Sequence, residues 1–175
     1  MPDGKPEVKP VKLICGITFA PSADLNEIDS RLESRFGPID SRSGKFDFSF
    51  TDYYESEMGP GLIKRFLSFE KLIAPDQLAK TKNETLSIET EISIDGRRTV
   101  NLDPGYLEES KLVLASTKNF AHRIYLGDNI WGEVTLRYEN GEFVTHPWTY
   151  PDYAAPLAFE YFKRVRAKYR EQLSQ

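Results

Sequence analysis

Three stretches of the chain have the hydrophobic patterns of β-strands. Residues 11–19 form a short apolar run without alternation, which is typical of a central strand that is covered on both faces. Residues 45–51 alternate strictly, with three phenylalanines separated by polar residues, which predicts a strand with one buried face. Residues 62–73 predict another strand, in which large apolar residues share one parity.

A helix is predicted between residues 24 and 36. Its apolar residues recur at steps of three and four positions, which places them on one helix face. These residues are Leu25, Ile28, Leu32 and Phe36. Asp24 stands three residues before Glu27, which is the spacing of a capping box. Gly37 and Pro38 then predict the end of the helix.

A second helix is predicted from Pro75, because proline suits the first helical position. One face of this helix again repeats at steps of three and four. That face carries Leu78, Thr81, Thr85, Ile88 and Ile92. The Asp-Gly pair at 95–96 turns the chain, and residues 98–103 predict the next strand. The element order so far is β-α-β-β-α-β, which is the order of the ferredoxin-like fold.

The segment that follows is less regular. Residues 103–105, Asp-Pro-Gly, predict a turn. Residues 107–118 predict a short helix, although the apolar stretch 112–115 would also suit a strand. Residues 122–126 and 130–138 predict a β-hairpin around the turn residues between them.

The C-terminal part completes the predicted fold. The Asn-Gly pair at 140–141 is a strong turn signal before a strand at 142–145. A helix is predicted from Leu157 onward. Its buried stripe consists of Phe159, Phe162, Val165 and Tyr169. We therefore expect an α+β fold, with a ferredoxin-like βαββαβ core extended by a β-hairpin and a C-terminal helix. Residues 1–10 are expected to form a loose leader and residues 11–175 a single α+β domain.

Composition narrows the classes of function. The chain has 175 residues, of which 39% are hydrophobic and 29% charged, and this is the composition of a soluble globular protein. The net charge of −4 argues against binding nucleic acid through bulk charge, although a local basic patch would remain compatible with it. No apolar run approaches a membrane span or a signal peptide, so we expect a cytoplasmic protein without membrane contact. The single cysteine, Cys15, is interpreted as a small core residue.

The predicted hairpin has one face that is rich in polar and aromatic residues. Side chains alternate along a strand, so the residues of one parity share a face. This face carries Arg123, Tyr125, Trp131, Glu133 and Arg137. The opposite face, interpreted as core, carries Ile124, Leu126, Ile130, Val134, Leu136 and Tyr138. The polar face suits either a solvated surface with cross-strand Arg–Glu pairs or the floor of a pocket for an anionic or aromatic ligand.

Three further positions are candidates for chemistry. His122 falls on the core side by parity, away from Arg123, so it is either a hydrogen-bonded structural histidine or an acid–base group. Asp103 ends a predicted strand, where sites tend to form, but an Asp before Pro-Gly is also good turn chemistry. Residues 116–118, Ser-Thr-Lys, could hold a phosphate, but no glycine-rich P-loop precedes them.

The leading hypothesis is an enzyme or binding protein for an anionic small molecule, such as a phosphate ester or a nucleotide. The expected anion-binding residues are Arg65, Lys118 and Arg123, and the expected stacking residues are Tyr125 and Trp131. His122 would act as acid or base, oriented by Asp103 or Glu133. No cofactor is identified and no metal site is assigned. The alternatives are a non-catalytic module that binds RNA or protein, and a homo-oligomeric scaffold.

Four long stretches of the sequence carry a resemblance to a known family. They are DYYESEMGPGLIKRFLSFEKLI, NLDPGYLEESKLVLASTKNFAHRIYLG, IWGEVTL and PWTYPDY. With these stretches the chain resembles domain-of-unknown-function family 4416, an uncharacterised prokaryotic family, over about residues 11–165. The resemblance implies membership of a family and no particular activity.

Overall fold

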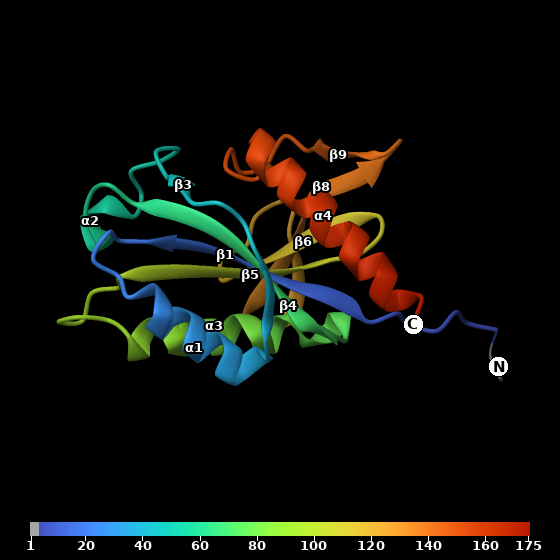
Figure 1. The fold of residues 1–175 in the computed structure, drawn as a ribbon, viewed down its shortest axis with the longest axis horizontal. Helices are drawn as coiled ribbons and strands as arrows, with labels where there is room; N and C mark the ends of the chain where they lie inside the picture. The colour runs from blue at the N-terminus through green and yellow to red at the C-terminus, as the bar shows by residue number, and fades with distance from the viewer. Residues whose placement is uncertain (1–3) are drawn as a thin grey trace.

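Strand β1 (Val11–Phe19) lies at the centre of an antiparallel sheet (Figure 1). The structure is a computed structural model, and it describes residues 4–175. Within these residues nine strands join one sheet in the order β2-β4-β1-β5-β6-β8-β7, with β3 paired to β4 and β9 paired to β8. The other strands are β2 (Ile39–Arg42), β3 (Phe46–Asp47), β4 (Ile63–Ile73), β5 (Val100–Leu107), β6 (Lys111–Ser116), β7 (Ile124–Gly127), β8 (Ile130–Glu139) and β9 (Glu142–Thr145).

Helices cover both faces of the sheet, so the fold is α+β (Figure 1). The helices are α1 (Leu25–Phe36), the short α2 (Glu55–Met58), the 3-10 turn η1 (Pro75–Gln77), α3 (Leu78–Glu91) and α4 (Pro156–Leu173). Leu13, Cys15 and Ile17 of β1 pack with α1 and α3 in one apolar cluster. Ile14 packs on the opposite face, in the aromatic cluster beneath α4. The prediction of a central strand covered on both faces is therefore confirmed.

Three of the four predicted helices agree closely with the structure. The carboxylate of Asp24 accepts hydrogen bonds from the backbone N–H groups of Asn26 and Glu27, so the N-terminal cap of α1 is confirmed. After the turn η1, helix α3 buries Leu78, Thr81, Thr85 and Ile88 of the predicted stripe, while Ile92 follows the end of the helix and is partly buried. Helix α4 begins one residue before the predicted start at Leu157. No helix within residues 4–175 has both the length and the hydrophobicity that crossing a membrane requires.

The second strand of the sheet differs from the prediction. The stretch 45–51 was expected to form a strand, but only Phe46–Asp47 pairs with β4. The strand next to β4 is instead β2, four residues that the hydrophobic pattern does not mark, with a register shift between Ile39 and Ser41. Phe48 is buried in a small cluster with Met58, while Phe50 is 41% exposed.

The predictions of a turn at 103–105 and of a helix at 107–118 are both wrong. Strand β5 continues through Asp103, Pro104 and Gly105 to Leu107, because these residues pair with β1. Residues 111–116 form β6, as the alternative interpretation of the apolar stretch predicted. This strand is buried on both faces, which removes the alternation that would have identified it.

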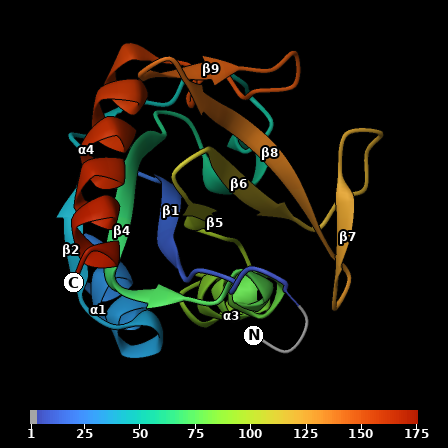
Figure 2. The same cartoon turned by 90° about the vertical axis from the view of Figure 1, so that its right-hand side faces the viewer.

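The β7–β8 hairpin is confirmed, but its faces are not as predicted. Asp128 and Asn129 form the turn with positive φ angles of 51° and 61°. Ile124 and Leu126 were expected in the core, yet they are 75% and 41% exposed. Strand β7 is the last strand of the sheet and lies at its edge (Figure 2), which leaves these side chains exposed. His122 lies in a turn before β7, so the parity of the strand does not apply to it.

Strands β5 and β6 separate after a short junction. Only residues 105–107 of β5 pair with residues 112–114 of β6, although both strands continue beyond this junction. The earlier part of β5 therefore has a free edge, and the end of β6 pairs only with β8. The sheet is split at this point, and the split opens away from the junction. Residues 4–10, before β1, are exposed and form no helix or strand; the rest of the predicted leader lies outside the described residues.

Candidate functional site

The split between β5 and β6 contains a pocket of about 470 Å³. Asn101 and Asp103 of β5 lie on one side of it, and Leu114 and Ser116 of β6 lie on the other. The segment from Phe48 to Tyr54, helix α3, the segment 117–123 and the turn at 150–153 also contribute to the lining, as do Lys64, Arg98 and Glu133. A pocket of this size can hold a small-molecule ligand or a cofactor.

One face of the sheet changes from apolar to polar as it enters the pocket. Residues that pair directly across antiparallel strands share a face, so Gly16, Phe66 and Asp103 point the same way. Phe66 belongs to the aromatic core beneath α4. Two residues further along the same face, the Thr18 position is flanked by Lys64 and Asn101. The pocket thus begins where the cover of α4 ends.

Lys64 is the central cation of the buried end of the pocket. Its side chain is 2% exposed, and its ammonium nitrogen lies 2.9 Å from Asp152 Oδ2 and 3.9 Å from Asp103 Oδ2. Burial disfavours the charged lysine, but these two carboxylates outweigh it and raise the pKa of Lys64 above its usual value. Lys64 is therefore a permanently charged ion-pair partner at neutral pH.

The hydroxyl of Tyr153 has no hydrogen-bond partner within the described part of the chain, although it is buried. It lies over Gly16, because a Cβ atom at residue 16 would be 2.4 Å from it. Burial, together with the charges of Asp103 and Asp152, raises the pKa of Tyr153 well above its usual value. The hydroxyl therefore stays protonated and can donate a hydrogen bond. An unsatisfied buried hydroxyl in a pocket wall is a candidate ligand contact.

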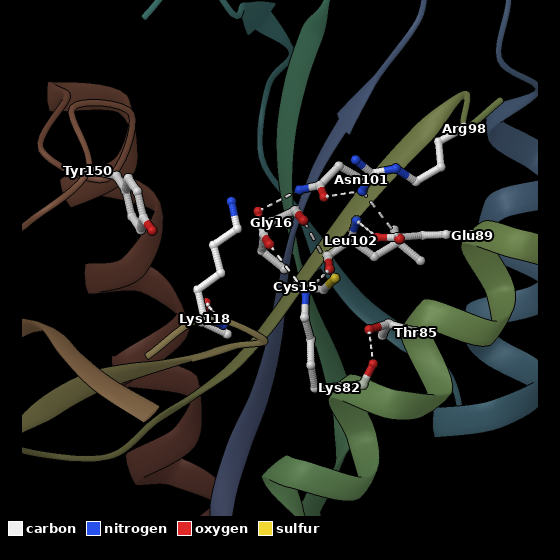
Figure 3. A network of polar contacts seen from close by, with 12 residues as sticks. Cys15, Gly16, Lys82, Thr85, Glu89, Arg98, Asn101, Leu102, Lys118 and Tyr150 are labelled. Atoms are coloured by element: carbon white, nitrogen blue, oxygen red, sulfur yellow. Dashed lines mark hydrogen bonds and ion pairs between the residues drawn. The ribbon is translucent and has the colours of Figure 1, made fainter. Parts of the chain in front are cut away.

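Helix α3 closes the free edge of β5 with charged side chains (Figure 3). Leu102 donates its N–H to Glu89 Oε1 at 2.7 Å and accepts a hydrogen bond at its carbonyl from Lys82 Nζ at 2.9 Å. Pro104, two residues on, faces the same edge and has no N–H to satisfy. Lys82 Nζ also lies 3.4 Å from Asp103 Oδ1. The lysine thus holds both the strand edge and the pocket carboxylate.

The role of Glu89 at the edge of β5 can be tested through the pH dependence of the protein's stability. Burial raises the pKa of Glu89 above its usual value, despite the attraction of Lys82 and the N–H of Leu102. A carboxyl group whose pKa is higher in the folded chain costs stability when ionised, and this cost disappears as the pH falls below the pKa of the unfolded chain. Glu89→Gln keeps an acceptor for Leu102 without the charge.

We therefore expect the unfolding free energy of Glu89→Gln, minus that of the wild type, to decrease as the pH is lowered from neutral to about 4. Urea denaturation of both proteins at a series of pH values measures this difference. A difference that stays constant or increases over this range would contradict the assigned role of Glu89.

The opposite wall of the pocket is organised by Arg123. A guanidinium group has five N–H donors, and here four of them are used within the protein. The acceptors are Ser116 Oγ at 3.0 Å, the Lys118 carbonyl at 2.8 Å, Tyr150 Oη at 2.7 Å and Glu133 Oε2 at 3.5 Å. Arg123 therefore joins β6, β8 and the turn at 150–153, and one donor remains for a ligand.

Lys118 is the most available cation of the pocket. Within residues 4–175 it has no carboxylate at ion-pair distance, and its ammonium group donates to Tyr53 Oη at 2.6 Å. This hydrogen bond lowers the pKa of Tyr53. The side chain projects into the space between Tyr150 and the network around Asn101 (Figure 3). Two of its three donors are free for an anion.

His122 contacts the pocket indirectly, through Glu133. Its Nε2 atom lies 2.6 Å from Glu133 Oε2, and the carboxylate of Glu133 lines the pocket. The imidazole stacks between Phe120 and Trp148, and His146 stacks on the other face of Trp148. The prediction that His122 points away from Arg123 is wrong, because both residues converge on Glu133.

A family model described as "Domain of unknown function (DUF4416)" matches residues 9–169. The chain belongs to this family. The DUF4416 resemblance seen in the sequence is thereby confirmed. No curated protein and no solved structure matches the chain. The DUF4416 match therefore identifies relatives by sequence and brings no activity with it.

In this DUF4416 chain, four of the predicted site residues line one pocket. They are Asp103, Lys118, Arg123 and Glu133. Tyr125 and Trp131 contact each other on β7 and β8, with ring centroids 5.3 Å apart, outside the pocket lining. Arg65 lies on the opposite face of the sheet, where it pairs with Asp29 of α1. No group of three or more His, Cys, Asp or Glu side chains in residues 4–175 is placed to hold a metal ion.

Several pocket residues of the DUF4416 chain were missed, and some of them have a signal in the sequence. Lys82 lines the pocket, and Glu89 holds the edge of β5 beside it. Both residues fall on the buried stripe of α3, where a charge is unexpected. Lys64 shares its strand parity with Phe66, which indicates a covered face rather than a solvated one. Tyr153 has no comparable local signal, because the turn that carries it is positioned only by the tertiary fold.

Proposed function

We propose that the pocket in the split sheet binds a small anionic molecule, of the class of phosphate esters and nucleotides. The observation that carries this proposal is the local charge. Among the described residues, the pocket is lined by five cationic side chains and three carboxylates, in a chain whose net charge is −4. The cations are Lys64, Lys82, Arg98, Lys118 and Arg123, and the carboxylates are Asp103, Glu133 and Asp152. Arg98 is paired with Glu57 and Glu89 beside the pocket, whereas Lys118 has no carboxylate partner within residues 4–175. A cleft with an excess of one sign of charge concentrates ligands of the opposite sign.

Lys118 is the primary contact of the anion in this proposal, because its ammonium group has no competing carboxylate. Arg123 shapes the wall and offers its remaining N–H. Aromatic side chains at the rim suit a ring on the ligand. These rim residues are Phe50, Tyr53, Phe120 and Tyr150, which are between 41% and 59% exposed. Glu133 faces the ligand, and His122 stands behind it as the group that orients this carboxylate or exchanges protons with it.

We also propose that the elements from β1 to β5 form a ferredoxin-like core. The order β2-β4-β1-β5 and the antiparallel pairing support this assignment. The position of α1 and α3 on one face supports it further (Figure 1). In this view β6 to β9 and α4 are an extension, and the pocket lies at the boundary between core and extension.

The alternative functions would use a different surface. A module that binds RNA or protein, or a homo-oligomeric scaffold, would use the exposed strand β7 with Ile124 and Tyr125. We favour the small-molecule function, because the charged side chains converge in the pocket and not on β7.

A thermal-shift screen tests the proposed function. The panel contains inorganic phosphate, nucleoside monophosphates and sugar phosphates, and the proteins are the wild type, Lys118→Ala and Lys80→Ala. Lys80 is an exposed lysine of α3 outside the pocket, so it is the matched control. We expect at least one anion to raise the midpoint of the wild type and of Lys80→Ala, and to raise that of Lys118→Ala much less. A saturating ligand at about a hundred times its Kd stabilises the fold by about 2.7 kcal/mol.

Two results would reject the proposed function. One is a panel in which no anion shifts the midpoint of the wild type. The other is an anion that stabilises Lys118→Ala as strongly as it stabilises the wild type, which would place its binding elsewhere on the surface.

A further inference from the structure

We propose that the ligand is a phosphorylated sugar or polyol, with its phosphate at Lys118 and its hydroxyl groups in the buried end of the pocket. This inference rests on the proposed function and specifies the ligand class. The buried end is formed by six residues, which we call the Asp103 cluster. They are Lys64, Lys82, Asn101, Asp103, Asp152 and Tyr153.

The Asp103 cluster suits a neutral group better than an ion. An anion placed there would face the carboxylates of Asp103 and Asp152, and a cation would face the ammonium groups of Lys64 and Lys82. These four charges already balance one another. A buried ion without a partner is strongly unfavourable, so the ligand atoms at this end should be uncharged and polar.

The free hydrogen-bonding capacity of the Asp103 cluster matches hydroxyl groups. Each oxygen of Asp103 accepts one hydrogen bond, from Lys82 to Oδ1 and from Asn101 to Oδ2, which leaves further lone pairs free. Lys82 donates to Leu102 and Asp103 and keeps one N–H. A hydroxyl group both donates and accepts, so it can use a free lone pair of Asp103 and a free N–H of a lysine at once.

Tyr153 adds an independent observation. Its hydroxyl is buried in the same cluster and has no partner in the described residues, so the protein alone leaves a donor and an acceptor unused. The rings of Phe50 and Tyr150, which line the pocket and are 41% and 44% exposed, offer apolar surfaces to the C–H groups of a sugar. A polyhydroxylated ligand satisfies both features.

The two ends of the pocket carry different charge. Lys118, on the β6 side of the split, has no carboxylate partner within the described chain, whereas the Asp103 cluster on the β5 side is internally balanced. A ligand with one anionic end and one hydroxylated end therefore fits the pocket in a single orientation. A phosphate without further hydroxyl groups would use only the Lys118 end.

Isothermal titration calorimetry on the full chain tests this inference. The ligands are ribose 5-phosphate, glucose 6-phosphate, glycerol 3-phosphate and inorganic phosphate, and the proteins are the wild type, Tyr153→Phe and Lys118→Ala. We expect at least one organic phosphate to bind the wild type about tenfold more tightly than inorganic phosphate. Tyr153→Phe should lower the affinity for that organic phosphate by about five- to tenfold, which corresponds to the loss of one hydrogen bond. The affinity for inorganic phosphate should not change.

Tyr153→Phe also has a readout that separates a binding role from a structural one. Its hydroxyl bonds to no described residue, so its removal should leave the thermal midpoint equal to or above that of the wild type. A lower midpoint, together with an equal loss of affinity for all four ligands, would show that the hydroxyl has a structural role. This result would overturn the inference.

The remaining outcomes distinguish the inference from the proposed function. If inorganic phosphate binds through Lys118 and no organic phosphate binds more tightly, the assignment of sugar hydroxyls is wrong while the anion site stands. If none of the four ligands binds in a way that depends on Lys118, both the inference and the proposed function are wrong.

Discussion

Lys64→Met is expected to lower the free energy of unfolding by about 3–5 kcal/mol, which is the typical cost of removing one partner from a buried ion pair. The methionine has a similar volume and fills the same space. However, Asp152, whose side chain is 6% exposed, would lose its ion-pair partner at 2.9 Å. The cost therefore arises from the carboxylate that remains and not from a cavity.

Urea denaturation measures this loss, with Lys71→Met as the control. Lys71 is an exposed lysine on the same strand, so its replacement should change stability by less than about 0.5 kcal/mol. A deficit as small as that of Lys71→Met would show that the Lys64 pairs are not important for stability.

Gly105→Ala is expected to lower the free energy of unfolding by about 1–3 kcal/mol or more, as overpacking in a rigid site does. A Cβ atom at residue 105 would lie 2.3 Å from the carbonyl oxygen of Val113 and 2.7 Å from Leu114 Cδ2. The first of these neighbours is backbone, so the strands β5 and β6 would have to move apart. The clash falls on the junction that closes the split.

Gly132→Ala in β8 is the matched control for this prediction. Its Cβ atom would meet only the side chain of Leu126 on the exposed strand β7, at 3.0 Å or more, and this side chain can move. Thermal and urea denaturation of both variants should therefore show a large loss for Gly105→Ala and a small one for Gly132→Ala. Equal losses would mean that the β5–β6 junction is not a constrained contact.

Local signals predicted those parts of the fold that local interactions determine. The cap at Asp24 and the apolar stripe of α1 are set by neighbouring residues, and both were found in the sequence. Strand β6 was misassigned because it is buried on both faces, so its pattern does not differ from that of a buried helix. Strand β2 has almost no pattern of its own and is held by its pairing with β4.

The candidate site was predicted in part, for a similar reason. Asp103, Lys118 and Glu133 were identified from unusual polar residues among strand residues, and all three line the pocket. Arg65 was predicted to bind the anion, but it is its neighbour Lys64 that lines the pocket. The two side chains lie on opposite faces of β4, and the sequence alone does not show which of these faces carries the polar site. The direction of the His122 side chain was predicted wrongly, because the alternation of the strand was extended by two residues into a turn.

The charged groups of the Asp103 cluster are held in place by contacts within the protein, which would lower the entropic cost of the binding proposed above. Lys64 and Lys82 are fixed by ion pairs and by a backbone carbonyl, so they lose little rotational freedom when a ligand binds. Immobilising a flexible side chain at a binding site costs about 0.5–1.5 kcal/mol, and here folding has already ordered these lysines. Lys118, at the exposed end, is held by one hydrogen bond to Tyr53 and by no ion pair within the described chain. For the ligand proposed above, the pocket would therefore combine a preorganised interior with one less constrained cation at its entrance.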